Sequence, residues 1–250
     1  MPPVLSISKY DEISKKLKAI QDVGRISEEY GLDVETMSII FYQKEVRRMI
    51  RIHGKIMSKR ADLLDEWNKG VSIVKLAEKE RFSPMLMAHI LLAAMNVSKK
   101  RTKKILKNPE IVDDERLERE IREAMEADYL YSPRAHEEQM KRGLEGEERL
   151  FAWLDSMGVE YTKESEMPNT EGRKTPDALL KNPIEIGGKE VRWLDSKASF
   201  GDPEEIKRSY KRQFKSYIEL FGPGAVIYWY GYVKMDLPDG LIVLDSLEKS

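Results

Sequence analysis

The hydrophobic pattern of this 250-residue chain changes its period at Gly158, and that change limits the folds open to it. Up to Gly158, apolar residues recur every three to four positions, as on one face of an α-helix. Beyond it they alternate in short runs near 159–164, 175–181, 189–198, 225–232 and 241–245, which is typical of β-strands. One strong helix interrupts these runs, with Asp202 as its cap, Pro203 as its first residue and Gly222 at its end. The sequence therefore predicts an α+β protein with several domains, all-helical first and built on a mixed sheet second.

Breaks in the pattern divide the chain into three parts. Residues 1–108 form a helical region, 109–131 an acidic connecting helix, and 132–250 a domain that opens with a long helix. Residues 1–107 contain 22 Lys and Arg against 13 Asp and Glu, a net charge of +9, and the remainder contains 21 against 31, a net charge of −10. A basic half joined to an acidic half suggests that one part binds a polyanion. The alternative is that both halves are solvated helical surfaces.

Two segments of the basic half read as a short helix, a tight turn and a second helix. In the first, Gly31 makes the turn and Asp33 caps the second helix. In the second, Ser72 caps the first helix and Pro84 opens the second, where its missing N–H costs nothing. This pattern predicts helix-turn-helix units that bind nucleic acid, although plain helical bundles contain the same hairpins. The run SKKRTKKILK at 98–107 either tracks phosphates or forms a solvated helix end.

Two charged residues, Asp195 and Lys197, lie in the apolar run WLDSKAS, where a buried strand normally carries no charge. Strand geometry sends both to one face and Ser196 to the other. Either this is a salt-bridged edge strand or the charges serve chemistry. Asp177 begins the preceding strand, and Gly187-Gly188 between the two is a good hairpin turn. The strands are therefore predicted to be antiparallel neighbours that bring Asp177 and Asp195 together.

The register of this hairpin gives a test. With a two-residue turn at Gly187-Gly188, a regular ladder pairs Ile186 with Lys189 and Asp177 with Ala198, which puts Asp177 on the wrong face. A one-residue bulge would correct the register, and Asn182-Pro183 is the natural place because proline is tolerated at bulges. We therefore predict an irregularity there. A regular hairpin would contradict a metal site built on both aspartates.

Two carboxylates within a few ångströms of each other repel unless a cation lies between them. Hard oxygen ligands predict Mg²⁺ or Mn²⁺. The chain has no cysteine, and its three histidines show no ligand spacing, so nothing in it offers the ligands that zinc prefers. The histidines, which we expect to be ordinary surface or partly packed residues, are His53, His89 and His136.

A third carboxylate is expected from the long helix. Glu147 shares its apolar face with Leu150 and Leu154, and a glutamate on such a face needs a partner, which the metal would be. Glu145 and Glu148 are the rival choices. A lysine beside a bound cation orients water or stabilises the charge of a phosphoryl transition state, and this is the role we expect for Lys197.

The helix that follows Asp202 places Gln213 among aromatic residues. A buried amide is expensive unless it is hydrogen-bonded, so Gln213 needs a hydrogen-bond partner, as a satisfied structural amide would have. The opposite side of this helix is basic and either touches phosphates or is solvated; it carries Lys207, Arg208, Lys211, Arg212 and Lys215. The strand VIYWYGY at 226–232 is either a base-stacking platform or a core strand with a few exposed rings.

The glutamate on the helix, Pro176-Asp177 and Asp195-Ser196-Lys197 resemble the PD-(D/E)XK nuclease superfamily. A wider match resembles the TPD-motif family, which has archaeal members; its residues are Thr175-Pro176-Asp177, the run WLDSKASFGD at 193–202, Gln213, FGPG at 221–224 and VIYW at 226–229. The resemblance is firm over about 130–232 and loose over the first hundred residues. It implies a helix-turn-helix region followed by a restriction-endonuclease-like domain.

The resemblance also implies roles for residues. Asp177, Asp195, Glu147 and the backbone carbonyl of Ser196 would hold the metal. Lys197 would be the catalytic lysine. In the superfamily the position of Gln213 often faces the active site, so Gln213 would support Lys197 by binding the attacking water or a metal-bound water. The family carries Glu-Ser-Lys where this chain has Asp195, so the metal is expected to bind in a slightly shifted position.

We therefore expect a divalent-metal-dependent nuclease that hydrolyses phosphodiester bonds in DNA, with the basic helical half presenting the substrate. Many enzymes of this fold act as dimers on branched or duplex DNA, so the resemblance extends to a homodimer and to structure-specific cleavage. The alternatives are a non-catalytic DNA-binding or adaptor protein on the same scaffold, and a nuclease that acts on RNA. No apolar run approaches the roughly 20 residues that span a bilayer, and the N-terminus lacks the apolar core of a signal peptide, so we expect a cytoplasmic protein.

Overall fold

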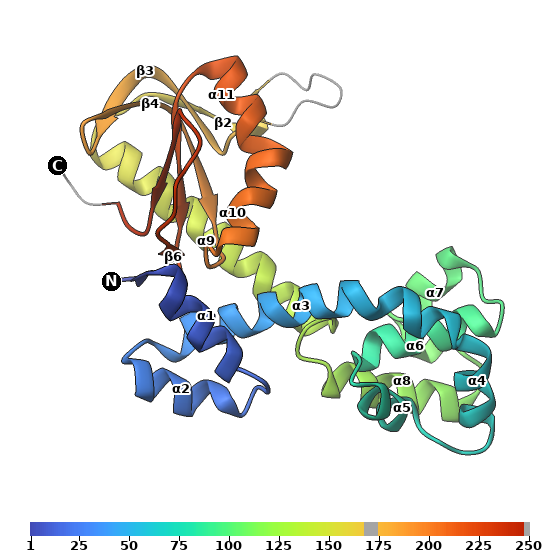
Figure 1. The fold of residues 1–250 in the computed structure, drawn as a ribbon. Coiled ribbons are helices and arrows are strands. Elements are labelled where there is room, and N and C mark those ends of the chain that lie inside the picture. Colours follow the sequence, from blue (N-terminus) through green and yellow to red (C-terminus); the bar gives the residue numbers. More distant parts are fainter. Residues whose placement is uncertain (168–174, 248–250) are drawn as a thin grey trace. The chain divides into compact units, whose positions relative to one another are not determined.

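The computed structural model describes residues 1–167 and 175–247 (Figure 1). It divides into two compact units. Met1–Phe41 and Lys141–Ser250 form the unit that contains the sheet, and Tyr42–Met140 form a helical unit. Two long helices, α3 (Val34–Ser58) and α9 (Pro133–Ser156), each run from one unit into the other.

This division differs from the boundaries predicted at 108 and 131. The predicted connecting segment contains α8 (Glu115–Ala127), which packs in the helical core through Leu117, Ile121 and Ala124. The buried Glu120 accepts hydrogen bonds from Trp67 Nε1 at 2.9 Å and from the backbone N–H of Ile73 at 3.0 Å. Apart from Glu120, the glutamates of α8 lie on its other, more exposed face, so the predicted acidic connecting helix is an amphipathic helix of the core.

The N-terminal segment belongs to the sheet unit. Its two-residue strand β1 (Val4–Leu5) pairs in parallel with β6 (Tyr232–Val233). It is followed by α1 (Ile7–Lys16), from which Tyr10 stacks on Phe200 and donates a hydrogen bond to Asp202 Oδ2 at 3.1 Å. Asp202 in turn caps the helix after the sheet's central strand, so this segment helps to hold that helix.

The helical unit contains several short helices. They are α4 (Arg60–Asn68), α5 (Ile73–Glu80), α6 (Pro84–Ala94), α7 (Lys99–Ile105) and α8. Ser72 and Ser83 accept hydrogen bonds from the first turns of α5 and α6, and Pro84 opens α6 as predicted. In the first predicted hairpin, α2 (Asp22–Tyr30) ends at the left-handed Gly31, and Asp33 caps α3 through the N–H of Thr36.

The predicted mixed sheet is confirmed. Five strands lie in the order β2-β3-β4-β5-β7, antiparallel from β2 to β4 and parallel from β4 to β7. Their bounds are β2 Tyr161–Lys163, β3 Ala178–Ile186, β4 Lys189–Lys197, β5 Gly224–Tyr228 and β7 Leu241–Leu244. The run predicted as one strand over 225–232 divides, because Tyr232 leaves the sheet to pair with β1.

Helices cover both faces of the sheet (Figure 1). On one face, α9 packs through Leu150 and Leu154 against Leu194 of β4. On the other, α10 (Pro203–Ser209) and α11 (Lys215–Phe221) pack against Trp193. Successive residues of β4 therefore face different helices.

The helix predicted from Pro203 to Gly222 is not regular. A five-residue π turn, Tyr210–Phe214, separates α10 from α11. At 100° per residue, the buried pair Ile206 and Ser209 and the buried pair Phe214 and Tyr217 would point roughly 80° apart on a continuous α-helix. The wider turn removes most of that offset, so both halves bury their apolar side in the same core.

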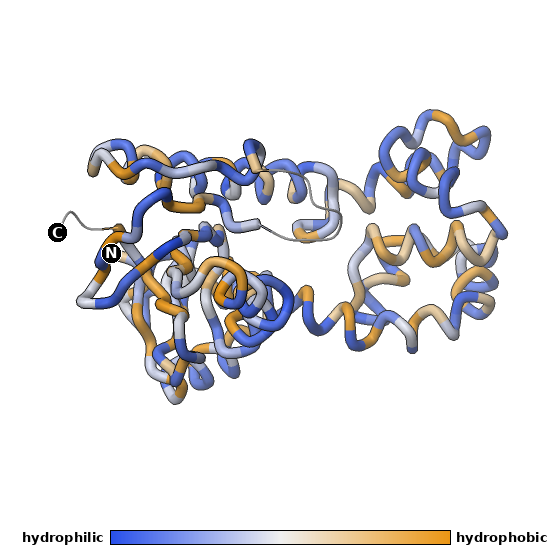
Figure 2. Tube along the Cα trace, turned by 90° about the horizontal axis from the view of Figure 1, so that it is seen from above, coloured by the Kyte–Doolittle hydropathy of each residue, from blue (hydrophilic) through white to orange (hydrophobic). Residues whose placement is uncertain are grey.

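No helix in the described part of the chain is long and apolar enough to cross a membrane. Figure 2 shows hydrophobic and hydrophilic residues alternating along the long helices, as expected when one side of each helix is buried.

Candidate active site

The β3-β4 hairpin brings Asp177 to Asp195. Its turn at Gly187-Gly188 has positive φ angles of 58° and 74°, and Ile186 pairs with Lys189, both as expected for a two-residue turn. The register then shifts between Leu179 and Ile184, where five residues along β3 correspond to two along β4. The predicted irregularity at Asn182-Pro183 is confirmed, but it adds three residues to β3 instead of one.

The shifted register pairs Ala178 with Leu194, so continuing it by one residue puts Asp177 level with Asp195. Oδ2 of Asp177 accepts a hydrogen bond from the backbone N–H of Ser196 at 2.6 Å. Nζ of Lys197 lies 2.5 Å from Oδ1 of Asp195. Asp195 is only 1% exposed, and Lys197 reaches it from the same strand face. The structure thus brings together three of the predicted site residues.

Burial and the neighbouring carboxylates raise the proton affinity of Asp177 and of Glu147. Burial, together with the nearby charge of Asp195, raises the pKa of Asp177 to about 8, although the Ser196 N–H and Lys197 oppose the shift. Burial also raises the pKa of Glu147, and the charges of Glu164 and Asp195 add to it. Burial alone would lower the pKa of Lys197, but the attraction of Asp195 outweighs it and the net shift is upward.

Glu147 lies on α9, which covers the face of the sheet opposite to α10 and α11. Among the three glutamates considered, Glu147 has a pKa that responds to Asp195, whereas Glu145 pairs with Lys141 at 3.8 Å and Glu148 is exposed. Its electrostatic proximity to Asp195 therefore favours Glu147 over its two rivals.

Gly146 and Trp229 set the distance between α9 and the end of β4. A Cβ on Gly146 would lie 2.6 Å from Trp229 Nε1 and 2.9 Å from Ser196 Oγ, so only glycine fits without movement. Trp229 Nε1 donates to Ser196 Oγ at 2.7 Å, and its backbone N–H donates to the carbonyl of Lys197 at 3.1 Å. Sequence reasoning named Trp229 only in the family match and as a possible stacking residue, and it missed Gly146; a glycine inside a helical pattern was the available signal.

The segment that carries Asp177 is anchored from two sides. The hydroxyl of Tyr217 donates to the carbonyl of Thr175 at 2.7 Å. The backbone N–H of Glu164 donates to the carbonyl of Asp177 at 3.2 Å, and Thr175 Oγ1 lies 3.4 Å from Glu164 Oε1. Glu164 is thus a fourth carboxylate at this site. It lies in an exposed turn with no apolar pattern around it, so the sequence carried no signal for it.

Gln213 lies in the π turn and is half-buried. It makes no hydrogen bond to another residue that the structure describes. Its neighbour Phe214 is closer to the chemistry, with its ring centroid 5.7 Å from Lys197 Nζ. The expected role of Gln213 remains a prediction.

A preformed metal cage is absent from the described residues, since no three His, Cys, Asp or Glu side chains among them converge closely enough to hold an ion. Asp177 and Asp195 are brought together, and Glu147 is near enough for its charge to raise the pKa of Asp177. The donors are all oxygen and carry more negative charge than Lys197 balances, and this composition fits a hard divalent cation.

Comparison with known proteins identifies the family. A family model described as "Protein of unknown function TPD sequence-motif" matches residues 113–247, more than half of the chain. The chain belongs to the TPD sequence-motif family. This membership confirms the resemblance to the TPD-motif family.

Curated relatives of this TPD-family chain are named CDAN1-interacting nuclease 1. The Xenopus laevis protein is 28% identical over 251 residues, which cover 92% of this chain and 83% of the relative. The human protein is 27% identical over 252 residues, covering 92% and 90%, and the Danio rerio protein is 32% identical over 168 residues, covering 64% and 56%. No solved structure matches the chain significantly.

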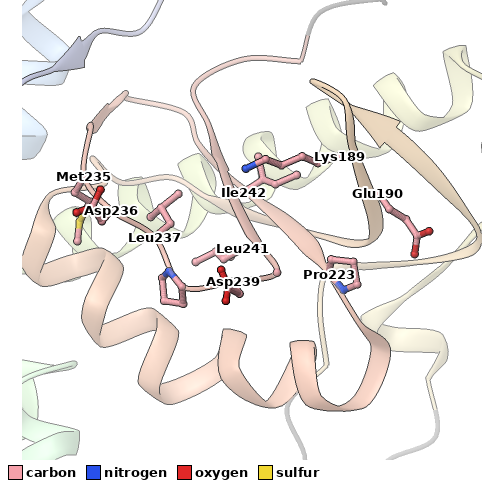
Figure 3. Close-up of a pocket in the computed structure, with 11 residues that line it drawn as sticks. Lys189, Glu190, Pro223, Met235, Asp236, Leu237, Asp239, Leu241 and Ile242 are labelled. Carbon is pink, nitrogen blue, oxygen red and sulfur yellow. The ribbon is translucent and has the colours of Figure 1, made fainter.

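The TPD family match contains every predicted site residue and begins just before α8. A separate hollow in this unit lies at the amino ends of β4, β5 and β7 (Figure 3). It is lined by Lys189, Glu190, Pro223 and residues 235–242. Asp195 and Lys197 lie at the carboxyl end of β4, so this hollow is not the candidate active site.

Proposed function

We propose that this TPD-family protein is a divalent-metal-dependent nuclease of the PD-(D/E)XK type, which hydrolyses phosphodiester bonds in DNA on a restriction-endonuclease-like domain. The observation that carries the proposal is the meeting of Asp177 and Asp195 beside Lys197 at the end of β4. A three-residue shift in the hairpin produces this meeting, and a regular hairpin would not. The name of the relatives, CDAN1-interacting nuclease 1, supports a nuclease.

In this proposal, Asp177, Asp195, Glu147 and the carbonyl of Ser196 would hold Mg²⁺ or Mn²⁺. When bound, such an ion polarises a phosphodiester and lowers the pKa of a water molecule. The side chains must draw closer than they lie in the structure, since no three of the described acidic groups form a cage.

Lys197 would act on the phosphate or on the attacking water. Its raised pKa keeps it protonated at neutral pH, so it offers charged N–H donors where negative charge develops. In hydrolysis the water oxygen forms a bond to phosphorus, and the ester oxygen leaves and takes up a proton. The amide of Gln213 would help to hold the water, with the wide π turn giving this side chain its position.

The test is cleavage of labelled linear, flapped and four-way DNA and of single-stranded RNA, with Mg²⁺, Mn²⁺ or EDTA. We expect DNA cleavage that EDTA abolishes and that Asp177→Asn or Lys197→Ala lowers by about a hundredfold or more. The exposed Glu185 on the same hairpin provides the control, because Glu185→Gln changes the same charge away from the site. Cleavage of the RNA strand alone would redirect the proposal to RNA.

The rival proposal is a non-catalytic adaptor. It is favoured by the name of the relatives, which describes them as interacting with CDAN1. The adaptor would be supported, and the nuclease proposal ended, if wild-type protein, Asp177→Asn and Lys197→Ala all failed to cleave every substrate with either metal.

A further inference from the structure

Neither of the two helical hairpins offers a helix that can read bases. A helix-turn-helix protein places the N-terminal residues of its second helix in the major groove, so these residues must be exposed and polar. In the second hairpin that helix is α6, and six of its eleven residues are buried. It contains no Lys or Arg, and it forms the centre of the helical core. An element in that position cannot enter a groove.

The second helix of the first hairpin is also unavailable. The first turns of α3 carry Glu35 and no basic residue before Lys44. Glu35 accepts a hydrogen bond from the hydroxyl of Tyr230 at 2.8 Å, and Thr36 is buried against the same region. This end of α3 is acidic and packed against the sheet unit to which it belongs.

The helix after α6 has the opposite character. Thr102 and Ile105 dock α7 on the core, and Ile105 is 3% exposed. The segment 98–107 contains no acidic residue. Its cations are all exposed, and none has a carboxylate partner among the residues that the structure describes; they are Lys99, Lys100, Arg101, Lys103, Lys104 and Lys107.

The side chains of α7 suit phosphates better than a membrane. Lys100, Lys103 and Lys104 lie opposite the docked face, so they can contact an extended row of charges. A helix that binds a membrane surface inserts apolar side chains into it, and α7 uses its apolar residues for docking. Six unpaired cations without an apolar face are the composition of a phosphate-contacting surface.

We infer that α7 is a binding surface for the phosphate backbone of nucleic acid, and that the helical unit binds its substrate without reading the base sequence. The inference rests on the proposed function for the identity of the ligand. It replaces base reading by the predicted helix-turn-helix units with backbone contact by the following helix.

The test is duplex DNA binding by the full chain in EDTA, which prevents metal-dependent cleavage. We expect Lys100→Gln, Lys103→Gln and Lys104→Gln together to weaken binding about tenfold or more at moderate salt. The slope of log Kd against log salt should fall by about 2 to 3, since each phosphate contact contributes about 0.9. Two duplexes of equal length and scrambled sequence should bind equally.

The matched control is the triple variant Lys55→Gln, Lys69→Gln and Lys75→Gln. It removes the same charge from exposed positions elsewhere in the helical unit and should bind like wild type within about twofold. The inference would be overturned if both triple variants weakened DNA binding equally or if neither weakened it. A clear preference between the scrambled duplexes would also overturn it. So would vesicles of phosphatidylserine and phosphatidylcholine whose binding depends on α7 while DNA binding does not.

The two proposals can fail separately. Loss of DNA binding through α7 in a protein that cleaves nothing would end the nuclease proposal and keep the α7 surface. If the α7 substitutions changed neither metal-dependent cleavage nor DNA binding, the nuclease proposal would stand and the inference about α7 would be wrong.

Discussion

The backbone N–H of Ser196 donates a hydrogen bond of 2.6 Å to Oδ2 of Asp177, a residue nineteen positions earlier in the chain. This bond joins the start of β3 to the end of β4 and holds the carboxyl of Asp177 beside that of Asp195. The Ser196 N–H stabilises the charged form of Asp177, but burial and the nearby charge of Asp195 outweigh it and raise the pKa of Asp177 to about 8.

The first prediction concerns stability without metal. The pKa of Asp177 is about 8 in the folded chain and about 3.9 when unfolded. Between these values the folded state holds a proton that the unfolded state has lost, so the free energy of unfolding falls as pH rises from about 4 to about 8. Asp177→Asn removes this dependence and should be more stable than wild type near pH 9, by about 1 kcal/mol or more.

Urea unfolding in EDTA at about pH 5 and about pH 9 measures this effect. Asparagine keeps an oxygen for the Ser196 N–H, so the hydrogen bond is preserved. Glu185→Gln, on an exposed position of β3, should keep the pH dependence of wild type. The same pH dependence in Asp177→Asn as in wild type would show that Asp177 titrates normally.

The second prediction concerns metal affinity and has the opposite sign with pH. If Asp177 is a ligand, Mn²⁺ must displace its proton, so the apparent affinity should rise by up to about tenfold per pH unit below pH 8 and level off above it. Calorimetric titration at several pH values, in buffers of different ionisation enthalpy, measures both the affinity and the proton released. Binding that is independent of pH between about 6 and 8 would remove Asp177 from the ligands.

The third prediction concerns the contact between α9 and β4. Gly146→Ala puts a methyl group 2.6 Å from Trp229 Nε1, so α9 or Trp229 must move. Such overpacking should cost roughly 1–3 kcal/mol in the free energy of unfolding and displace the adjacent Glu147, lowering kcat. Gly143→Ala on the same helix meets nothing within 4 Å and should be neutral or stabilising. Thermal unfolding and cleavage rates compare the two, and equal effects would contradict the close approach at Gly146.

The hairpin shows how far sequence reasoning reaches. Alternation and the Gly187-Gly188 pair predict two strands and their turn, because side-chain direction and positive φ are local properties. Asn182-Pro183 predicts where the ladder breaks, since proline cannot donate to it. The size of the break depends on the backbone hydrogen bonds that form on either side, which no local pattern fixes.

The elements that sequence reasoning missed depend on distant partners. Val4 and Leu5 are too short a run to read as a strand, and they become one only because Tyr232 and Val233 lie alongside. The π turn reflects two apolar stripes that are offset along one helix. That offset was present in the sequence, but it has meaning only once both stripes must meet the same core.

The residues of the candidate site also differ in how clearly the sequence reveals them. The charges of Asp195 and Lys197 are conspicuous because an apolar strand surrounds them, so the sequence reveals them. Trp229 resembles any other aromatic residue of a core strand, and its two hydrogen bonds to the end of β4 appear only in three dimensions.

The last prediction tests that role of Trp229. Trp229→Phe keeps an aromatic ring and the backbone N–H that bonds to Lys197, but it removes the Nε1–H donor to Ser196 Oγ. Loss of this bond should cost about 1 kcal/mol in the free energy of unfolding. Because Ser196 also carries the N–H that binds Asp177, kcat should fall about tenfold with little change in KM for DNA.

Trp153→Phe is the matched control. Trp153 packs against the same core as Trp229, and its buried Nε1 has no hydrogen-bond partner among the described residues. Loss of this N–H donor should therefore leave the free energy of unfolding unchanged or raise it. Ser196→Ala completes a double-mutant cycle with Trp229→Phe, and the two losses should be clearly less than additive because they remove one bond. Additive losses, or an equal fall of kcat in Trp153→Phe, would show that Trp229 is only a core residue. The position of Ser196 would then be set by the β-ladder alone.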